Sequence, residues 1–161
     1  MGQQQLLLLV LGMVIVGIAV VAGIQAFSEG RQKAATDAAV SDALRIATDV
    51  QAWALKPEAF GGGGGDLQKG SGEGATPVTF ADLGYPAKGE NDAYGYEDND
   101  TYVTPNGCFE LSTNNGNFPA TITAKSDCGA SATTYAVVTI TGPNVGDIVT
   151  EVNPSSSQQP Q

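Results

Sequence analysis

An unbroken apolar run near the N-terminus constrains this chain more than any other feature. From Leu6 to Ile24 every residue is apolar or glycine, which makes 19 consecutive positions, and no charged side chain occurs before Glu29. A helix needs about 20 such residues to cross the hydrocarbon core of a bilayer. The run therefore predicts a helix within residues 1–27 that lipid or other apolar surfaces must surround.

A secretory signal peptide is the main alternative for this segment. Signal peptides carry Lys or Arg before an apolar core of about 7–15 residues. Here no basic residue precedes the run, and the run is longer than that core. The small residues from Ala19 to Ala22 resemble a cleavage motif and keep this alternative open. We expect the segment to be part of the working protein.

Charge and composition exclude several classes of function. The chain of 161 residues has 17 acidic and 7 basic side chains, a formal net charge of −10 and no histidine. An acidic surface repels nucleic-acid phosphates, so direct nucleic-acid binding is not expected. The absence of histidine removes the commonest general base and metal ligand. Because the sequence has no nucleophile–base pair and no cofactor motif, we expect neither an enzyme nor a cofactor.

The two cysteines, Cys108 and Cys128, predict one disulfide bond. They enclose 19 residues in a chain that is rich in Gly, Ser and Thr, as is common in an oxidising compartment. Closing a loop of this size stabilises a fold by about 3 kcal/mol in the chain-entropy model. A reactive pair or half of a metal site is disfavoured because there is no CxxC spacing and no histidine.

Residues 28–56 continue the helical pattern with strong helix formers, no proline and a single glycine. We expect one helix from about Gln3 to Leu55, roughly 80 Å long at 1.5 Å per residue. Its half over 1–27 is apolar, and its half over 28–56 is amphipathic. Trp53 is expected to be a core anchor and not a ligand platform. The predicted core stripe comprises Val40, Ala43, Leu44, Ala47, Val50 and Ala54.

Residues 57–101 are predicted to be a glycine-rich connecting loop. Pro57 ends the helix because the residue before a proline avoids the helical region. Five consecutive glycines follow at Gly61–Gly65, without the Lys-Ser/Thr pair of a phosphate-binding loop. We interpret them as a flexible connection. Residues 79–84 are expected to form a short turn or half-strand that places Phe80 and Leu83 against the head.

Residues 102–152 are predicted to form an antiparallel sheet of about four strands. Runs rich in Thr, Val, Ile, Tyr and Phe alternate with turns that contain Asn and Gly. The short separations predict hairpins. One face of the sheet needs an apolar partner, and the second half of the helix supplies it. The predicted fold is therefore α+β, with residues 153–161 as a flexible tail.

The acidic stretch before the sheet contains two further candidate sites. Glu97, Asp98 and Asp100 offer hard oxygen ligands of the kind that calcium prefers. The stretch lacks the twelve-residue loop of a known calcium motif, so a solvated acidic loop is the favoured interpretation. Asn99 begins an Asn-Asp-Thr sequon and is a candidate for glycosylation.

The order of a long apolar helix, a glycine-rich connection, an antiparallel sheet and a late disulfide resembles the type IV pilins and their secretion-system relatives. Members of this family carry a glutamate at the fifth position and then a long aliphatic run. Here Gln5 stands at that position, and Leu6 and Leu7 begin the run. We expect Gln3, Gln4 and Gln5 to form a polar contact layer between subunits without a charge to desolvate.

The apolar half lacks the proline that interrupts this helix in the family and has Gly12, Gly17 and Gly23 instead. Small residues let apolar helices approach closely, so we expect these glycines to be packing positions. Local unwinding near Gly17 to Gly23 is the alternative.

The resemblance implies a fold and a function. The fold is a long N-terminal helix whose C-terminal half packs on the sheet. The function is that of a structural subunit that polymerises with other copies of itself into an extracellular filament for adhesion, motility or DNA uptake. Before assembly it would reside in the inner membrane, and a separate ATP-using machinery would assemble it. The alternatives are a pseudopilin of a type II secretion system and a monomeric membrane-anchored binding domain.

Overall fold

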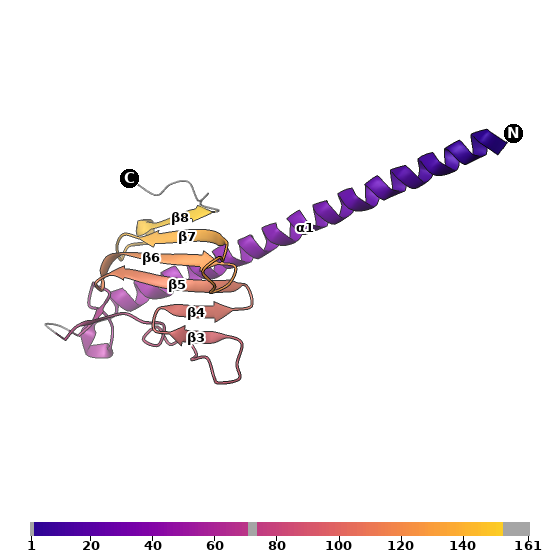
Figure 1. Cartoon of the computed structure of the whole chain (residues 1–161). Helices are drawn as coiled ribbons and strands as arrows, with labels where there is room; N and C mark the ends of the chain where they lie inside the picture. The colour runs from indigo at the N-terminus through magenta and orange to yellow at the C-terminus, as the bar shows by residue number, and fades with distance from the viewer. Residues whose placement is uncertain (1, 71–73, 153–161) are drawn as a thin grey trace. The chain divides into compact units, whose positions relative to one another are not determined.

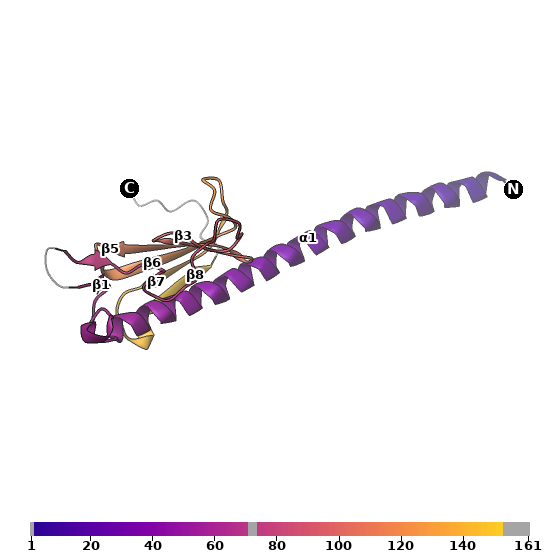
Figure 2. The same cartoon turned by 90° about the horizontal axis from the view of Figure 1, so that it is seen from below.

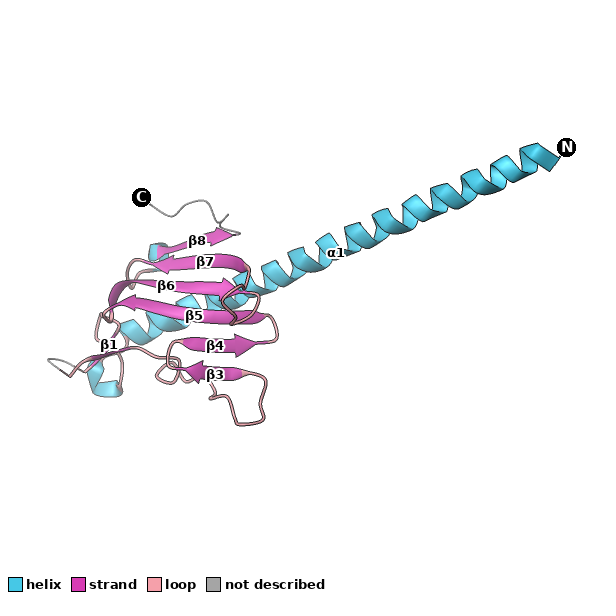
Figure 3. Cartoon of the chain, viewed as in Figure 1, coloured by secondary structure: helices cyan, strands magenta, loops and turns pink. Residues whose placement is uncertain are grey.

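The computed structural model describes residues 2–70 and 74–152, and the predicted tail over 153–161 lies outside this part. Figure 1 colours the chain by residue number, and Figure 3 distinguishes its helices and strands by colour. They are α1 (Gly2–Leu55), the 3-10 helix η1 (Glu58–Phe60), β1 (Gln68–Lys69), β2 (Thr76–Pro77), β3 (Gly95–Asp98), β4 (Thr101–Thr104), β5 (Gly107–Asn114), β6 (Asn117–Lys125), β7 (Thr134–Ile140), η2 (Val145–Asp147) and β8 (Ile148–Val152). The fold is α+β, as the sequence predicts.

The helix α1 runs without a break from Gly2 to Leu55, which confirms the prediction of one helix from about Gln3. Its residues belong to two compact units. The unit up to Ala35 is called the apolar segment below. The unit from Thr36 onward is called the head. Each is described by itself.

The main sheet of the head is a six-stranded antiparallel meander in the order β3-β4-β5-β6-β7-β8 (Figure 3). Strands β5 to β8 are the four predicted ones. The predicted number is wrong, because β3 and β4 belong to the same sheet. Both extra strands have four residues and lie in or next to the acidic stretch, where Asp, Asn and Gly disfavour strands. Pairing with β4 overrides that preference in β3, which has the sequence Gly-Tyr-Glu-Asp. The residues of β4, Thr-Tyr-Val-Thr, favour strands, and β4 pairs with β5 over its whole length. The sheet therefore begins at Gly95 and not at residue 102.

The core of the head lies between the sheet and the part of α1 that follows Thr36 (Figure 2). The predicted stripe is correct in outline, but Leu44 is 37% exposed and Ile46 is buried in its place. Ile46 lies three residues after Ala43 and four before Val50, and therefore shares their face. The buried residues are Ala39, Ala43, Ile46, Ala47, Val50, Trp53 and Ala54 from α1, with Phe109, Leu111, Ala120, Ile122, Ala124, Ala136, Val138 and Ile140 from the sheet. Alanines on both sides let helix and sheet approach closely.

The glycine run after α1 is an ordered helix cap, and the interpretation as a flexible connection is wrong. The N–H of Gly63 donates to the carbonyl oxygen of Trp53 at 3.2 Å. The N–H of Gly65 donates to the carbonyl oxygen of Ala54 at 2.7 Å. These carbonyls belong to the last turn of α1, where the C=O groups have no N–H donors within the helix. A Cβ on Gly63 would lie 1.8 Å from the carbonyl oxygen of Asp66, so no other residue fits there.

The predicted turn over residues 79–84 is confirmed. Its Asp82 carboxylate accepts hydrogen bonds from the backbone N–H and the hydroxyl of Thr79, at 3.2 and 2.8 Å. Phe80 is fully buried, and Leu83 packs against the core beside it. The turn thus places the following residue, Tyr85, with its ring edge-on to Phe80 at 5.6 Å.

Candidate assembly surface

All the large apolar side chains from Leu6 to Phe27 are exposed. Their exposed fractions run from 50% at Leu11 to 77% at Met13. The set comprises Leu6, Leu7, Leu8, Leu9, Val10, Leu11, Met13, Val14, Ile15, Val16, Ile18, Val20, Val21, Ile24 and Phe27. Within the described residues, α1 is the only helix whose length and composition suit a membrane span, and its most apolar stretch has no buried residue. A helix that is apolar all round needs lipid or protein around it.

The free energy gained by burying the apolar segment is large. Fully burying one Val, Leu, Ile, Phe or Met side chain is worth about 1.5–3 kcal/mol relative to leaving it in water. For the exposed set the sum is at least on the order of 20 kcal/mol. This exceeds the typical net stability of a whole domain. The segment is therefore compatible with membrane anchoring and with burial among other apolar helices, but not with long exposure to water.

The three glycines of the apolar segment are not required by the fold of a single chain. A Cβ placed on Gly12, Gly17 or Gly23 would meet no atom within 4 Å. The helix is continuous through all three positions, so the alternative of local unwinding is absent from the structure. Each glycine destabilises a helix by about 1 kcal/mol relative to alanine. What these positions gain from glycine must therefore come from outside the chain.

Small residues line one face of the apolar segment. At 3.6 residues per turn, the five members of this face fall within about 60° of one another around the helix axis. They are Gly12, Ala19, Gly23, Ala26 and Gly30, and we call them the small-residue stripe. Gly17 lies on the other side of the helix, about 140° from Gly12. Such a stripe lets a second helix approach at a short interaxial distance, as small residues do between membrane helices.

The predicted polar layer of Gln3, Gln4 and Gln5 occupies the first turns of α1, and all three side chains are exposed. Gln3 lines a shallow apolar groove on the helix surface together with Leu6, Leu7, Val10, Leu11 and Val14. The layer therefore adjoins the apolar surface, where any contact would exclude water. Amide groups in such a place need hydrogen-bond partners from the surrounding molecules. Whether other subunits supply them stays a prediction.

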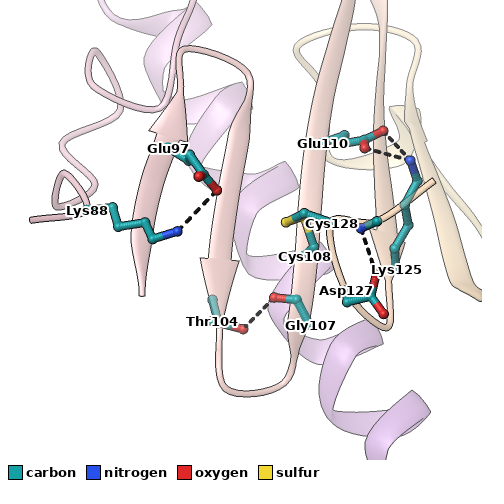
Figure 4. The surroundings of a disulfide bond; sticks show 10 residues. Lys88, Glu97, Thr104, Gly107, Cys108, Glu110, Lys125, Asp127 and Cys128 are labelled. Carbon is teal, nitrogen blue, oxygen red and sulfur yellow. Dashed lines mark hydrogen bonds and ion pairs between the residues drawn. A yellow bond between two sulfur atoms is a disulfide. The ribbon is translucent and has the colours of Figure 1, made fainter. Parts of the chain in front are cut away.

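The disulfide between Cys108 and Cys128 is present and confirms the predicted pairing. It joins β5 to the loop after β6, with the two Cα atoms 5.3 Å apart. Cys108 alternates with the core residue Phe109, so the bond lies on the sheet face away from α1. Figure 4 shows it beside the ion pair of Glu110 and Lys125, whose charged atoms are 2.6 Å apart. The bond ties the outer face of the sheet to its loop.

The structure does not bring the candidate calcium ligands together as a metal site. Glu97 forms an ion pair with Lys88 at 3.2 Å (Figure 4). Partial burial raises the pKa of Asp100, and the charge of Asp98 adds to the effect. Among the residues that the structure describes, no three Asp, Glu, Cys or His side chains are grouped so that they suit a metal ion. The stretch forms the edge strand β3 and its turn into β4.

The candidate glycosylation residue Asn99 lies in the turn between β3 and β4 and is exposed. Its backbone carbonyl accepts a hydrogen bond from the N–H of Phe80 at 3.0 Å, which holds the turn against the head. The side chain is therefore on a fixed, accessible turn. Its modification stays a prediction.

The head also has a polar cluster that the sequence did not reveal. The Tyr85 hydroxyl donates to the Asp49 carboxylate at 2.6 Å, and the Arg45 guanidinium lies 5.9 Å from the centre of the Tyr85 ring. Partial burial, followed by this hydrogen bond, raises the pKa of Tyr85. Arg45 and Asp49 are one helical turn apart, but nothing local indicates that Tyr85 joins them. The cluster depends on the turn over residues 79–84.

Comparison with protein-family models, curated proteins and solved structures finds no match for this chain. The architecture therefore carries the functional argument by itself. A long apolar N-terminal helix and an antiparallel sheet on its continuation are compatible with a pilin-like fold. Of the features described, the exposed apolar segment most restricts the functions that this chain can have.

Proposed function

We propose that this chain is the repeating structural subunit of a type IV pilus-like filament. The observation that carries the proposal is the apolar segment, exposed all round and bearing a stripe of small residues, in a chain whose head has a complete core of its own. The head needs nothing from the apolar segment in order to fold. The segment is therefore available for contacts between molecules.

The free energy of burying the apolar segment supports two successive locations for the subunit, first a membrane and then a filament. In a bilayer the apolar side chains are shielded by lipid, and about 20 residues are enough to span it. In a filament the same side chains would be shielded by the helices of neighbouring subunits. The large cost of exposing them to water prevents spontaneous release. The subunit would thus wait in the inner membrane until an ATP-using machinery moves it into an extracellular filament. Adhesion, motility and DNA uptake are the candidate uses of that filament.

A monomeric membrane-anchored head is the second candidate, because one apolar helix of this length anchors a protein equally well. The small-residue stripe favours the filament. A helix that only contacts lipid gains nothing from glycine at positions 12, 23 and 30, whereas close helix–helix packing does. A filament also accounts for the layer of Gln3, Gln4 and Gln5, since partner subunits can supply hydrogen bonds to the amide groups and lipid tails cannot.

The test uses cells that produce the full chain, with electron microscopy of material sheared from their surface. Gly23→Leu adds a large side chain to the stripe, and we expect filaments to be lost while the protein remains in the membrane. Val21→Leu is the matched control on the other side of the helix, where the side chain is already large, and we expect filaments to persist. Circular dichroism and the thermal unfolding of the head report whether either variant disturbs the fold.

Two outcomes contradict the proposal. Absence of filaments from the unaltered chain, together with a monomer in mild detergent, favours the anchored head. Filaments that assemble equally well with Gly23→Leu remove the small-residue stripe as an assembly surface.

A further inference from the structure

The Asn-Asp-Thr sequon that begins at Asn99 is a motif that filament formation does not require. Among the asparagines of the chain, Asn99 alone has Ser or Thr two residues later without a proline in between, since Asn153 is followed by Pro154. A sugar on such a sequon is bulky, and the motif is meaningful where a secreted protein presents it on its surface. The structural context of Asn99 therefore decides whether the motif can be used.

Asn99 and Asp100 form the two-residue turn between the paired strands β3 and β4, at one edge of the main sheet (Figure 3). The carbonyl oxygen of Asn99 accepts a hydrogen bond from the N–H of Phe80 at 3.0 Å. The carbonyl oxygen of Asp100 accepts one from the N–H of Leu111 at 2.8 Å. Two separate segments of the head thus hold the backbone of the turn, while both residues of the turn are exposed. The fold presents the sequon at its surface.

The reactive groups of the sequon are not engaged within the head. Among the residues that the structure describes, no hydrogen bond uses the side-chain amide of Asn99. By contrast, the side-chain amide of Asn106, in the next turn of the sheet, donates to the Asp42 carboxylate at 2.7 Å. The hydroxyl of Thr101, the third residue of the sequon, also has no partner among the described residues, and Thr101 is half-buried at the start of β4. Modification of Asn99 therefore breaks no contact of the fold.

A groove beside the turn leaves space for a sugar. Its volume is about 390 Å³, and Asn99 and Asp100 form part of its wall. Most of its other lining side chains carry a hydroxyl or an amide, namely Thr76, Thr79, Ser112, Thr113 and Asn115. A sugar attached to Asn99 would begin at this polar surface, where its hydroxyl groups meet hydrogen-bonding groups and cover no apolar core.

We propose that Asn99 carries an N-linked sugar. The donor is a sugar whose C1 atom is bonded to the phosphate of a polyprenyl lipid, and a membrane glycosyltransferase brings it to the chain. The Nδ2 atom of Asn99 forms a bond to C1, the bond between C1 and the phosphate oxygen breaks, and the lipid phosphate leaves with that electron pair. The proton that Nδ2 loses goes to a base of the transferase.

The disulfide supports the location that this chemistry needs. The bond between Cys108 and Cys128 is of the kind that persists in an oxidising compartment, outside the cytoplasm. A head on that side of the membrane is where a secreted protein presents its acceptor sequons. The modification requires this location but not assembly, so it is independent of the filament proposal.

The test is the intact mass of the full chain, purified in mild detergent from the cells that naturally produce it. We expect a mass above that of the polypeptide by at least one sugar residue, and peptide fragmentation should place the addition on Asn99. Asn99→Gln removes the acceptor and should abolish the added mass. Thr101→Val removes only the hydroxyl, at a strand position that suits valine, and should abolish it as well. Thr101→Ser keeps a hydroxyl and should retain the added mass.

Asn91→Gln is the matched control, because Asn91 is exposed before β3 and is followed by Asp92 and Ala93, which complete no sequon. The added mass should persist in this variant. Circular dichroism and thermal unfolding show whether each variant is folded. An unaltered chain with the mass of the bare polypeptide overturns the proposal, and so does an added mass that persists in folded Asn99→Gln.

Discussion

The ordered glycine cap makes a sharp prediction for Gly63→Ala. The new Cβ would lie 1.8 Å from the carbonyl oxygen of Asp66 and 2.7 Å from Cζ3 of Trp53. The first neighbour is backbone, so relief requires the cap itself to move. Overpacking of this kind costs about 1–3 kcal/mol. Displacing the cap also removes its hydrogen bonds to the end of α1, each worth about 1 kcal/mol. We therefore expect a loss of about 3 kcal/mol in the free energy of unfolding of the head.

The assay is urea unfolding of the full chain in mild detergent, followed by the fluorescence of Trp53, the only tryptophan. A loss of about 3 kcal/mol would also lower the melting temperature by roughly 10–15 °C for a head of this size. Gly74→Ala is the matched control, because a Cβ there meets nothing within 4 Å. It should leave stability unchanged or raise it by about 0.4–1 kcal/mol through the unfolded state.

The reasoning fails if Gly63→Ala and Gly74→Ala unfold at the same urea concentration. In that case the hydrogen bonds between the run Gly61–Gly65 and the end of α1 contribute nothing to the stability of the head.

Three further predictions test other parts of the molecule. Replacing Cys108 and Cys128 together by alanine should lower the free energy of unfolding by about 3 kcal/mol, and adding reductant to the unaltered chain should give a similar loss in urea unfolding. The raised pKa of Tyr85 means that the folded head holds this proton more tightly than the unfolded chain does. Its contribution to stability is therefore full below the unfolded value near 10.0 and declines as the pH rises above it, so Tyr85→Phe should unfold with a smaller pH dependence between about pH 9 and 11. Gln5→Leu removes one amide of the polar layer and should yield filaments that dissociate at lower temperature, as followed by electron microscopy after heating; filaments of unchanged stability would remove the layer from the assembly contacts.

Local patterns predicted much of the fold because the forces involved act over short sequence distances. The apolar run and the helix formers after it fixed α1 to within one residue of its start. Alternating apolar residues between turn signals indicated β5 to β8. The spacing of apolar residues in α1 was less informative about which of them are buried. Leu44 and Ile46 are both aliphatic, and only contact with the sheet decides which of them is buried.

Other features were hidden because their cause lies in distant contacts. β3 is built largely from residues with low strand preference, and it forms because β4 offers an edge to pair with. The glycine run looks like a linker in sequence, but the end of α1 and the carbonyl of Asp66 turn it into a cap. No spacing in the sequence indicates that Tyr85 meets Asp49.

The sequence by itself determined the apolar segment, the length of α1, the pairing of Cys108 with Cys128 and the α+β class, since each depends on composition or on neighbours along the chain. Only the tertiary structure decided the cap, the edge strand β3 and the hydrogen bond between Tyr85 and Asp49. Each of them depends on contacts that exist only once the chain has folded, so no local pattern of residues predicts it.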